Sequence, residues 1–482
     1  MADMGDLPLA SNEQLVFNGV DADTGEYLFA PMSLAALAER VRGIEPRGDQ
    51  HQQDLRHRHH DDEEHLGVMY GRDPESLAAV GWALVTADGT DPRVLEALEP
   101  LRRHRRQEAG ELYQELTVLP GDDCEQFRSR HGMGPGPADP RKIPYYLLLV
   151  GSPERIPFSF QYQLDVTYAV GRVHFDTAEE YASYAASVVA AENSPEPVAA
   201  EPRKPRVHLF GTRNPGDTPT ALSASRLVEP MRAELGELAP GVGLTTDVGQ
   251  GATKARLYDL LLDGAVPEVL FTATHGVGCS ATGRRETQGA LLCQDWPGPL
   301  MKPSRISCDH YLAGVDLPTD RPVVPRIVFS FCCYGAGTPR VADFPSPATN
   351  VGLFNDETPF IARLPQRLLG NPAGGSLGFI GHVDRAWSCS FLWAGLTPQI
   401  AAMASTLMAI LDGVRMGSAM EFLNSRYAEI STELTAKLDE IKRYGLLVED
   451  RDLAGLWTAN NDARNFVLLG DPAVRAVRTT GT

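Results

Sequence analysis

The sequence predicts an α/β protein in which a mostly parallel sheet is sandwiched by helices and preceded by a smaller α/β unit. After residue 204, five short apolar runs are separated by helix or loop: RVHLFGT, VLFTATHG, RIVFSFCC, SLGFIGH and NFVLLGD. An earlier run, YYLLLVG at 145–151, is equally apolar and ends in a turn. Continuous apolar runs of this length are typical of strands that are buried on both faces of a parallel sheet.

Residues 1–75 show weak periodicity, so we expect an N-terminal extension that is partly flexible. This part contains the charged stretch RGDQHQQDLRHRHHDDEEH at 47–65. Its histidines and acidic residues form either a solvated linker or a metal site. The linker is favoured, because closed metal sites usually take their ligands from a rigid scaffold.

Residues 76–203 are predicted to form the smaller α/β unit. GWALVTAD is a strand-like run, 94–110 has apolar residues at helical spacing, and VTYAVGRV is a further strand. TAEEYASYAASVVAAE is predicted to be an amphipathic helix capped by Thr177. The segment NSPEPVAAEPRKPR at 193–206 carries four prolines. It indicates a boundary near residue 204, with the second domain at 204–482.

Composition disfavours several classes of protein. A net charge of −19 over 482 residues disfavours binding to nucleic-acid phosphate. No apolar stretch approaches the ~20 residues that span a bilayer, and the N-terminus lacks the pattern of a signal peptide. The seven cysteines form no CxxC pair and no disulfide framework. We therefore expect a cytoplasmic protein with reduced thiols, without nucleic-acid or membrane partners.

Two predicted strands end in reactive side chains. VLFTAT leads into His275-Gly276, and RIVFSF leads into Cys332-Cys333. Because reacting groups of a parallel α/β sheet gather at the C-terminal ends of its strands, neighbouring strands would bring the imidazole and a thiol together. A thiolate attacks carbonyl carbon, the imidazole carries the proton, and the N–H groups of Gly276 and Cys333 are candidates to hold the oxyanion. These residues suit acyl transfer from a peptide.

The order strand-His-Gly, spacer, strand-small residue-Cys resembles the caspase-like peptidases of clan CD, and most closely their gingipain branch. The resemblance covers roughly residues 80–477. YYLLLVGSPERIPF with LDVTYAVGRVHFDTAEEYASY looks like the subdomain that precedes the caspase-like one in gingipains. GVRMGSAM and NFVLLGDPAVR look like that family's closing helix and last strand. The resemblance implies a cysteine endopeptidase with a caspase-like catalytic domain.

Carried over by position, His275 matches the family histidine and Cys333 the nucleophile. Cys332 matches the small residue before it and stays the second candidate, because adjacent strand-end residues point to opposite sides. Taken singly, a strand-end histidine or a pair of cysteines in an apolar strand is more often structural. Their joint placement, each before a glycine-rich loop, favours a catalytic pair.

The resemblance implies that loops beside this pair form the pocket for P1, the residue recognised before the cleaved bond. Asp217 in TRNPGDT would favour a P1 arginine or lysine, whereas Arg213 in the same loop would favour an acidic P1. Phe331 stands where basic-specific relatives often have aspartate. Asp384 and Trp387 follow the next strand, where gingipains place an aromatic pocket wall. An Asp-Arg pair in a loop is more often a surface ion pair, and a tryptophan more often contributes to packing. A basic P1 is favoured through the gingipain resemblance.

Activation and partners are predicted from position. Cleavage at Arg284 or Arg285, or removal of the first ~75 residues, would suit a zymogen, because exposed polar loops are where nicking concentrates. We expect a protein or peptide substrate and an activating protease or an inhibitor. The resemblance to caspase-like peptidases implies a role in a prokaryotic signalling or defence cascade. The sequence contains none of the common metalloprotease, nucleophile-elbow, phosphate-loop or calcium-loop motifs, so we predict no cofactor and no metal.

Two alternatives stay open. The first alternative to an endopeptidase is a catalytically silent caspase-fold binding or scaffold protein. The second is a cysteine hydrolase or acyltransferase with another class of substrate. An intact histidine and cysteine disfavour the first.

Overall fold

The computed structural model describes residues 14–15, 19–27, 32–33, 67–194, 205–263, 267–278, 285–300, 306–340, 358–393, 397–444 and 448–477. The charged stretch 47–65 lies outside these residues, as does Arg284. Within the described part, no helix is long and apolar enough to cross a membrane.

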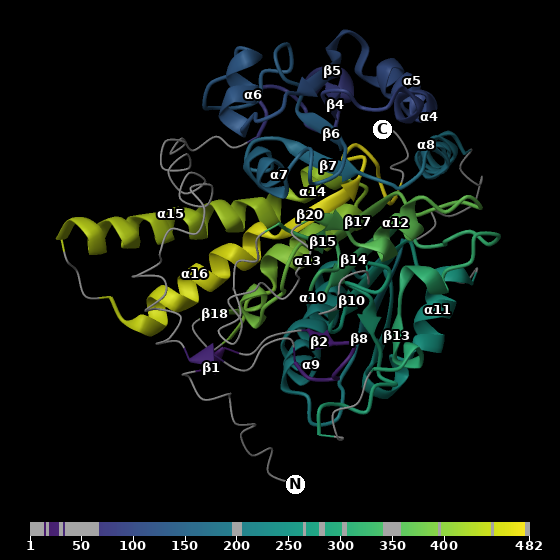
Figure 1. Cartoon of the computed structure of the whole chain (residues 1–482), viewed down its shortest axis with the longest axis vertical. Coiled ribbons are helices and arrows are strands. Elements are labelled where there is room, and N and C mark those ends of the chain that lie inside the picture. The colour runs from purple at the N-terminus through teal and green to yellow at the C-terminus, as the bar shows by residue number, and fades with distance from the viewer. Residues whose placement is uncertain are drawn as a thin grey trace.

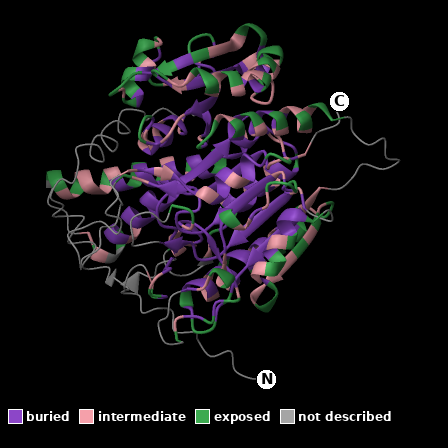
Figure 2. Cartoon of the chain, turned by 45° about the vertical axis from the view of Figure 1, so that its right-hand side comes forward, coloured by how far each residue is buried: buried purple, intermediate pink, exposed green. Residues whose placement is uncertain are grey.

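A ten-stranded sheet runs through the molecule in the order β5-β4-β6-β7-β20-β17-β14-β10-β8-β9 (Figure 1). Neighbouring strands pair in parallel on both sides of one antiparallel step, between β20 and β17. Helices cover the buried strands on the outside (Figure 2). The predicted fold class, a mostly parallel sheet sandwiched by helices, is confirmed. The strands are β4 Trp82–Ala87, β5 Tyr113–Val118, β6 Tyr146–Val150, β7 Ala169–Val173, β8 Arg206–Gly211, β9 Gly243–Val248, β10 Val269–Ala273, β14 Ile327–Phe331, β17 Gly378–His382 and β20 Phe466–Gly470.

All five apolar runs after residue 204 form strands of this sheet. The edge strand β9 was not predicted, because its sequence GLTTDV is half polar and no residue of it is buried. The segment 94–110 forms two helices instead of one, with the second beginning just before Pro100. Proline fits the first turn of a helix but not its interior, which explains the break. Thr177 caps its helix as predicted.

The longer helices surround the sheet, and α15 and α16 lie side by side at one end of it (Figure 1). A π-helical turn, Ala224–Val228, joins α9 to α10. The helices are α3 Leu77–Val80, α4 Pro92–Ala97, α5 Glu99–Ala109, α6 Cys124–Arg130, α7 Phe158–Leu164, α8 Ala178–Asn193, α9 Thr218–Ser223, α10 Glu229–Leu238, α11 Lys254–Leu262, α12 Arg363–Leu369, α13 Ala401–Leu411, α14 Met416–Ala419, α15 Glu421–Tyr444 and α16 Asp450–Arg464.

The loops contain short two-stranded pairs. One of these pairs joins the N-terminal segment to the loop after β10. The pairs are β1 Gln14–Leu15 with β3 Met32–Ser33, β2 Val20–Asp21 with β11 Val277–Gly278, β12 Leu291–Leu292 with β13 Tyr311–Leu312, β15 Gly337–Thr338 with β16 Phe360–Ile361, and β18 Leu392–Trp393 with β19 Thr397–Pro398.

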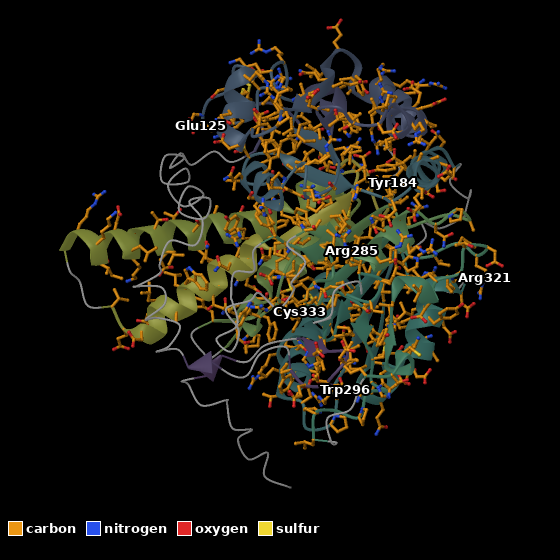
Figure 3. The ribbon with its side chains drawn as sticks, viewed as in Figure 1. Glu125, Tyr184, Arg285, Trp296, Arg321 and Cys333 are labelled. Atoms are coloured by element: carbon orange, nitrogen blue, oxygen red, sulfur yellow. The ribbon has the colours of Figure 1, made fainter. Side chains whose placement is uncertain are left out.

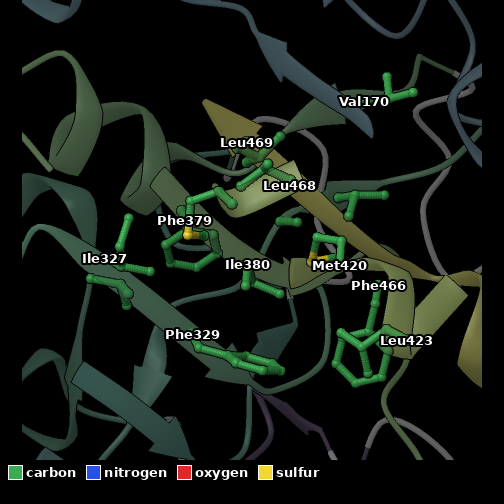
Figure 4. Packing of buried hydrophobic residues seen from close by; sticks show 14 of the residues in the cluster. Val170, Ile327, Phe329, Phe379, Ile380, Met420, Leu423, Phe466, Leu468 and Leu469 are labelled. Carbon is green, nitrogen blue, oxygen red and sulfur yellow. The ribbon is translucent and has the colours of Figure 1, made fainter. Parts of the chain in front are cut away.

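Strand β20 joins the two halves of the sheet. It pairs along its whole length with β17, whereas its pairing with β7 is confined to Leu469 and Arg172. Apolar side chains of β14, β17 and β20 pack beneath the junction, among them Phe329, Phe379 and Leu468 (Figure 4). The strands of 76–203 and of 204–482 therefore share one sheet, and the division into two domains near residue 204 stays a prediction.

A buried charge cluster fixes this junction. The carboxylate of Asp471, directly after β20, accepts hydrogen bonds from Trp82 Nε1 at 2.9 Å and from Arg105 Nε at 2.7 Å. Arg105 also pairs with Glu192 and Glu108. Burial by itself would lower the pKa of Arg105, but the three carboxylates outweigh it and hold the guanidinium charged. The cluster thus ties β4 and α5 to the C-terminal strand.

We expect Asp471→Ala to lower the free energy of unfolding by about 3 kcal/mol, because it leaves a buried indole N–H unsatisfied and a buried guanidinium short of one partner. Urea denaturation followed by circular dichroism measures the loss. Asp263→Ala is the matched control, since its pair with Arg321 is exposed and should contribute less than about 1 kcal/mol. Equal losses in the two variants would contradict the role of the buried cluster.

Candidate active site

Parallel pairing brings His275 and Cys333 to the same edge of the sheet. Strands β10 and β14 are in register, with Ala273 opposite Phe331 as the last pair. His275 and Cys333 each stand two residues beyond that pair, so the chain leaves the sheet at the same level in both strands. Both side chains are fully buried.

Gly276 makes the close approach of these two turns possible. A β-carbon on Gly276 would lie 1.8 Å from the carbonyl oxygen of Cys333, far inside van der Waals contact. Only glycine fits there. The backbone of Cys333, rather than that of Cys332, therefore packs against the residue that follows the histidine.

Asp217 holds one side of the imidazole. It is the N-cap of α9, beyond the end of β8, and its carboxylate oxygens lie 3.0 and 3.1 Å from His275 Nε2. Asp217 also accepts the backbone N–H and the hydroxyl of Thr220. Burial by itself would raise the pKa of Asp217, but His275 and these hydrogen bonds outweigh it and lower the pKa. The Asp217 carboxylate is thus charged, and it orients the imidazole ring of His275.

The other ring nitrogen of His275 is also engaged. The backbone N–H of Gly19 donates to Nδ1 at 2.7 Å, from a residue 256 positions away in the chain. A backbone N–H can only donate, so Nδ1 carries a lone pair and the ring proton sits on Nε2, facing Asp217. Tyr27 and Trp296 flank the ring at centroid distances of 6.0 and 5.9 Å. Trp296 lies below Cys333 in the view of Figure 3.

The two neighbouring thiols have different surroundings. The backbone N–H of Ala386 donates to Cys333 Sγ at 3.3 Å, whereas Cys332 Sγ lies 3.3 Å from the hydroxyl of Ser330. Burial raises the pKa of Cys333 well above that of a free thiol, and the Ala386 N–H offsets this only in part. Burial also raises the pKa of Cys332, to about 12. Both thiols are therefore protonated near neutral pH.

The loop after β17 lies against the Cys333 turn. The carbonyl of Asp384 accepts the backbone N–H of Tyr334 at 2.6 Å, and Arg385 Nε lies 3.2 Å from the Tyr334 hydroxyl. The backbone N–H of Trp387 donates to Asp462 at 2.8 Å. Asp384 has a left-handed backbone, with φ of 69°, and Tyr334 has φ of 58°. Such conformations are strained for residues other than glycine, and here two of them flank the candidate nucleophile.

The two remaining predicted residues that the structure describes lie on the surface. Arg213 is exposed and pairs with Glu229 at 3.2 Å. Arg285 is exposed and lies over the ring of Phe360 at 5.0 Å. The structure therefore brings Asp217, Asp384 and Trp387 into the neighbourhood of the pair or of its supporting loops, and leaves Arg213 on the surface.

Sequence reasoning missed the contact between Asp217 and His275. A signal was present, because Asp before Thr-Pro-Thr is a helix N-cap pattern and it follows the strand RVHLFG. Since β8 is the neighbour of β10, an N-cap at the end of β8 lies beside the end of β10. No sequence pattern indicated that Gly19 would contact His275 or that Tyr27 would contact Asp217.

Among the described residues, one group has a geometry that could suit a metal, namely His104, Glu108 and Glu192. Arg105 already pairs with both glutamates, so a cation there would compete with a buried guanidinium. The group lies beside the Asp471 cluster, outside the site described above.

No protein-family model matches the sequence, and no curated protein is found as a relative. Solved structures with a similar chain path include the Arg specific cysteine proteinase gingipain R, at 11% identity, 85% coverage of this chain, 80% of that chain and a TM-score of 0.45. The complex of Porphyromonas gingivalis RgpB pro- and mature domains overlays at 11% identity, with 82% and 79% coverage and a TM-score of 0.41. The Saccharomyces cerevisiae separase–securin complex overlays at 10% identity, with 72% and 17% coverage and a TM-score of 0.28. Identities this low do not transfer an activity.

Because Cys332 and Cys333 are buried, we expect their thiols to react slowly with an alkylating reagent. We expect iodoacetamide at pH 7–8 to label Cys308, which is exposed, long before Cys333 or Cys332, because alkylation needs an accessible thiolate. Peptide mapping by mass spectrometry measures the three rates, and the urea-unfolded chain, in which the cysteines should react alike, is the control. Labelling of Cys333 as fast as Cys308 would show that the site is open in solution.

Proposed function

We propose that the chain is a cysteine endopeptidase in which Cys333 is the nucleophile, His275 carries the proton and Asp217 orients His275. The observation that carries the proposal is the equal offset of His275 and Cys333 beyond paired strands, with Gly276 against the Cys333 backbone. The carboxylate of Asp217 at Nε2 adds the third group of a proton-transfer chain.

The reaction follows from these groups. The S–H bond of Cys333 breaks and its proton passes to His275 Nδ1, while the thiolate adds to the peptide carbonyl carbon. The N–H groups of Gly276 and Cys333 hold the oxyanion, and Asp217 stabilises the imidazolium. When the tetrahedral intermediate collapses, the C–N bond breaks and Nδ1 returns the proton to the leaving amine. Water, deprotonated by the same nitrogen, then hydrolyses the thioester.

For specificity we propose a basic P1 residue, arginine or lysine. Of the two acidic candidates, Asp217 is already hydrogen-bonded to His275, Thr220 and Tyr27. We assign the P1 cation to Asp384, which lies beside the Cys333 turn with Arg385 Nε 4.0 Å from its carboxylate. Trp387 follows it in the same loop as the candidate pocket wall. The acidic alternative would rely on Arg213, whose charge is already shared with Glu229.

The remaining parts of the proposal concern biology. A regulated protease of a prokaryotic signalling or defence cascade fits a site that is closed as it stands, and cleavage at Arg284 or Arg285 would be one activation step. An activating protease or an inhibitor would be its protein partner. Two observations support these roles, the buried site and the exposure of Arg285.

Cleavage of fluorogenic peptides with P1 Arg, Lys, Asp or Leu tests the activity. We expect Cys333→Ala to lower kcat/KM by about a thousandfold or more, because the nucleophile is removed. Cys332→Ala should retain most of the turnover, and Cys308→Ala, at an exposed thiol, is the matched control. Full activity of Cys333→Ala would refute the assignment. If neither the intact nor the nicked chain cleaves any peptide, the silent binding protein is favoured.

Asp217→Asn tests the orienting role. Asparagine still caps a helix, so the fold should be kept, whereas kcat should fall by roughly a hundredfold or more because the imidazolium loses its counter-charge and the ring its preferred tautomer. Thermal unfolding checks the fold, and the pH profile of kcat/KM should shift along with the fall. A fall in kcat that only mirrors lost folded protein would leave Asp217 with a purely structural role.

A further inference from the structure

The segment 19–27 covers the imidazole from the side that the mechanism needs. Val20 and Asp21 form β2, which is labelled in Figure 1. Strand β2 pairs in parallel with β11, directly after His275-Gly276. The pairing places the Gly19 N–H on His275 Nδ1, at 2.7 Å. Nδ1 is the nitrogen left for Cys333, since Nε2 faces Asp217.

The segment is anchored by burial as well as by hydrogen bonds. Val20 and Ala22 are 0% and 3% exposed and pack in a small apolar cluster with Val277 and Trp296. The Ala22 N–H donates to the carbonyl of Gly278 at 3.0 Å. The rest of the cluster comprises Ala290, Leu292, Ile306 and Ala313. The segment therefore binds as a unit, separate from the main core.

Tyr27 contacts the orienting carboxylate. Its hydroxyl donates to Asp217 Oδ1 at 2.7 Å. Between Asp21 and Tyr27 the chain folds back, since the Asp21 N–H donates to the carbonyl of Glu26 and the Asp21 carboxylate accepts the N–H of Thr24. The two ends of this turn thus reach both partners of the proton-transfer chain, His275 through Gly19 and Asp217 through Tyr27.

We propose that residues 19–27 are an inhibitory segment, which keeps His275 from accepting the Cys333 proton until the segment leaves. The inference rests on the proposed function and adds its regulation. While the Gly19 N–H occupies the Nδ1 lone pair, the thiol has no base, and the burial that raises its pKa keeps it protonated. Release of the segment uncovers Nδ1 and opens the face of the site where Tyr27 now lies.

A cut between the segment and the rest of the chain tests this. A recognition sequence for a site-specific protease is inserted within the charged stretch 47–65 of the full chain, and the cut protein is compared before and after gel filtration removes the N-terminal fragment. We expect removal to raise both the Cys333 alkylation rate and kcat/KM by at least about tenfold. If the segment-bound state is favoured over the open state by about 1.4 kcal/mol, only about one molecule in ten is open before removal. Adding a synthetic peptide of residues 14–33 should reverse both effects.

The peptide also isolates the hydrogen bond to His275. Replacing Gly19 in the peptide by N-methylglycine removes the N–H and should weaken inhibition roughly three- to tenfold, as expected for one hydrogen bond. A Glu26→Gln peptide is the matched control, since that side chain is exposed and should inhibit like the parent peptide. The ¹⁵N signal of His275 Nδ1 should move when the parent peptide binds and move less with the N-methyl peptide.

The outcomes separate the two proposals. If alkylation and the His275 signal respond to removal but no peptide is cleaved, the segment covers the site as proposed and the peptidase assignment fails. If the intact chain cleaves peptides and removal changes neither turnover nor alkylation, the inhibitory role is refuted. Loss of turnover together with loss of the folded circular dichroism spectrum would also refute it, because the segment would then be a permanent part of the site.

Discussion

The register between β10 and β14 is the constraint on which the candidate site depends. Because the two parallel strands are in register, both end at the same level, with Ala273 opposite Phe331. The functional side chain stands two residues beyond the end of each strand, at His275 and at Cys333. A slip of one residue would turn His275 or Cys333 to the opposite face of the sheet. The absence of a β-carbon at Gly276 lets the turns after the two strands meet in direct backbone contact, which fixes their relative position.

The strands that set this register are held from both sides. Strand β8 flanks β10 and delivers Asp217, and β17 flanks β14 and delivers the loop with Asp384 and Ala386. Beyond β17, the antiparallel strand β20 connects to the sheet half formed by β4–β7, where Asp471 satisfies Trp82 and Arg105. A buried charge is expensive unless every partner is present, so this junction favours one arrangement of the two halves.

In this structure the site cannot start the proposed reaction, because His275 has no nitrogen available as a base and the Cys333 thiol is protonated. Both nitrogens of His275 have partners, and Cys333 is buried where a thiolate would be poorly solvated. Two strained backbone conformations, at Tyr334 and Asp384, border the same turn. Strain at such a position is kept only when the surrounding packing enforces it.

The sequence by itself determined the fold class, the five buried strands after residue 204 and the two strand ends that carry His275 and Cys333, because apolar runs and the residues at their ends are local properties of the chain. It did not reveal β9, whose half-polar edge sequence gives no clear period, or the break at Pro100 within one apolar pattern. Only the tertiary structure decided that Asp217 faces His275, that one sheet spans both halves, and that Gly19 and Tyr27 reach the site. These are contacts between residues far apart in sequence, and no local pattern records which distant segments a fold brings together.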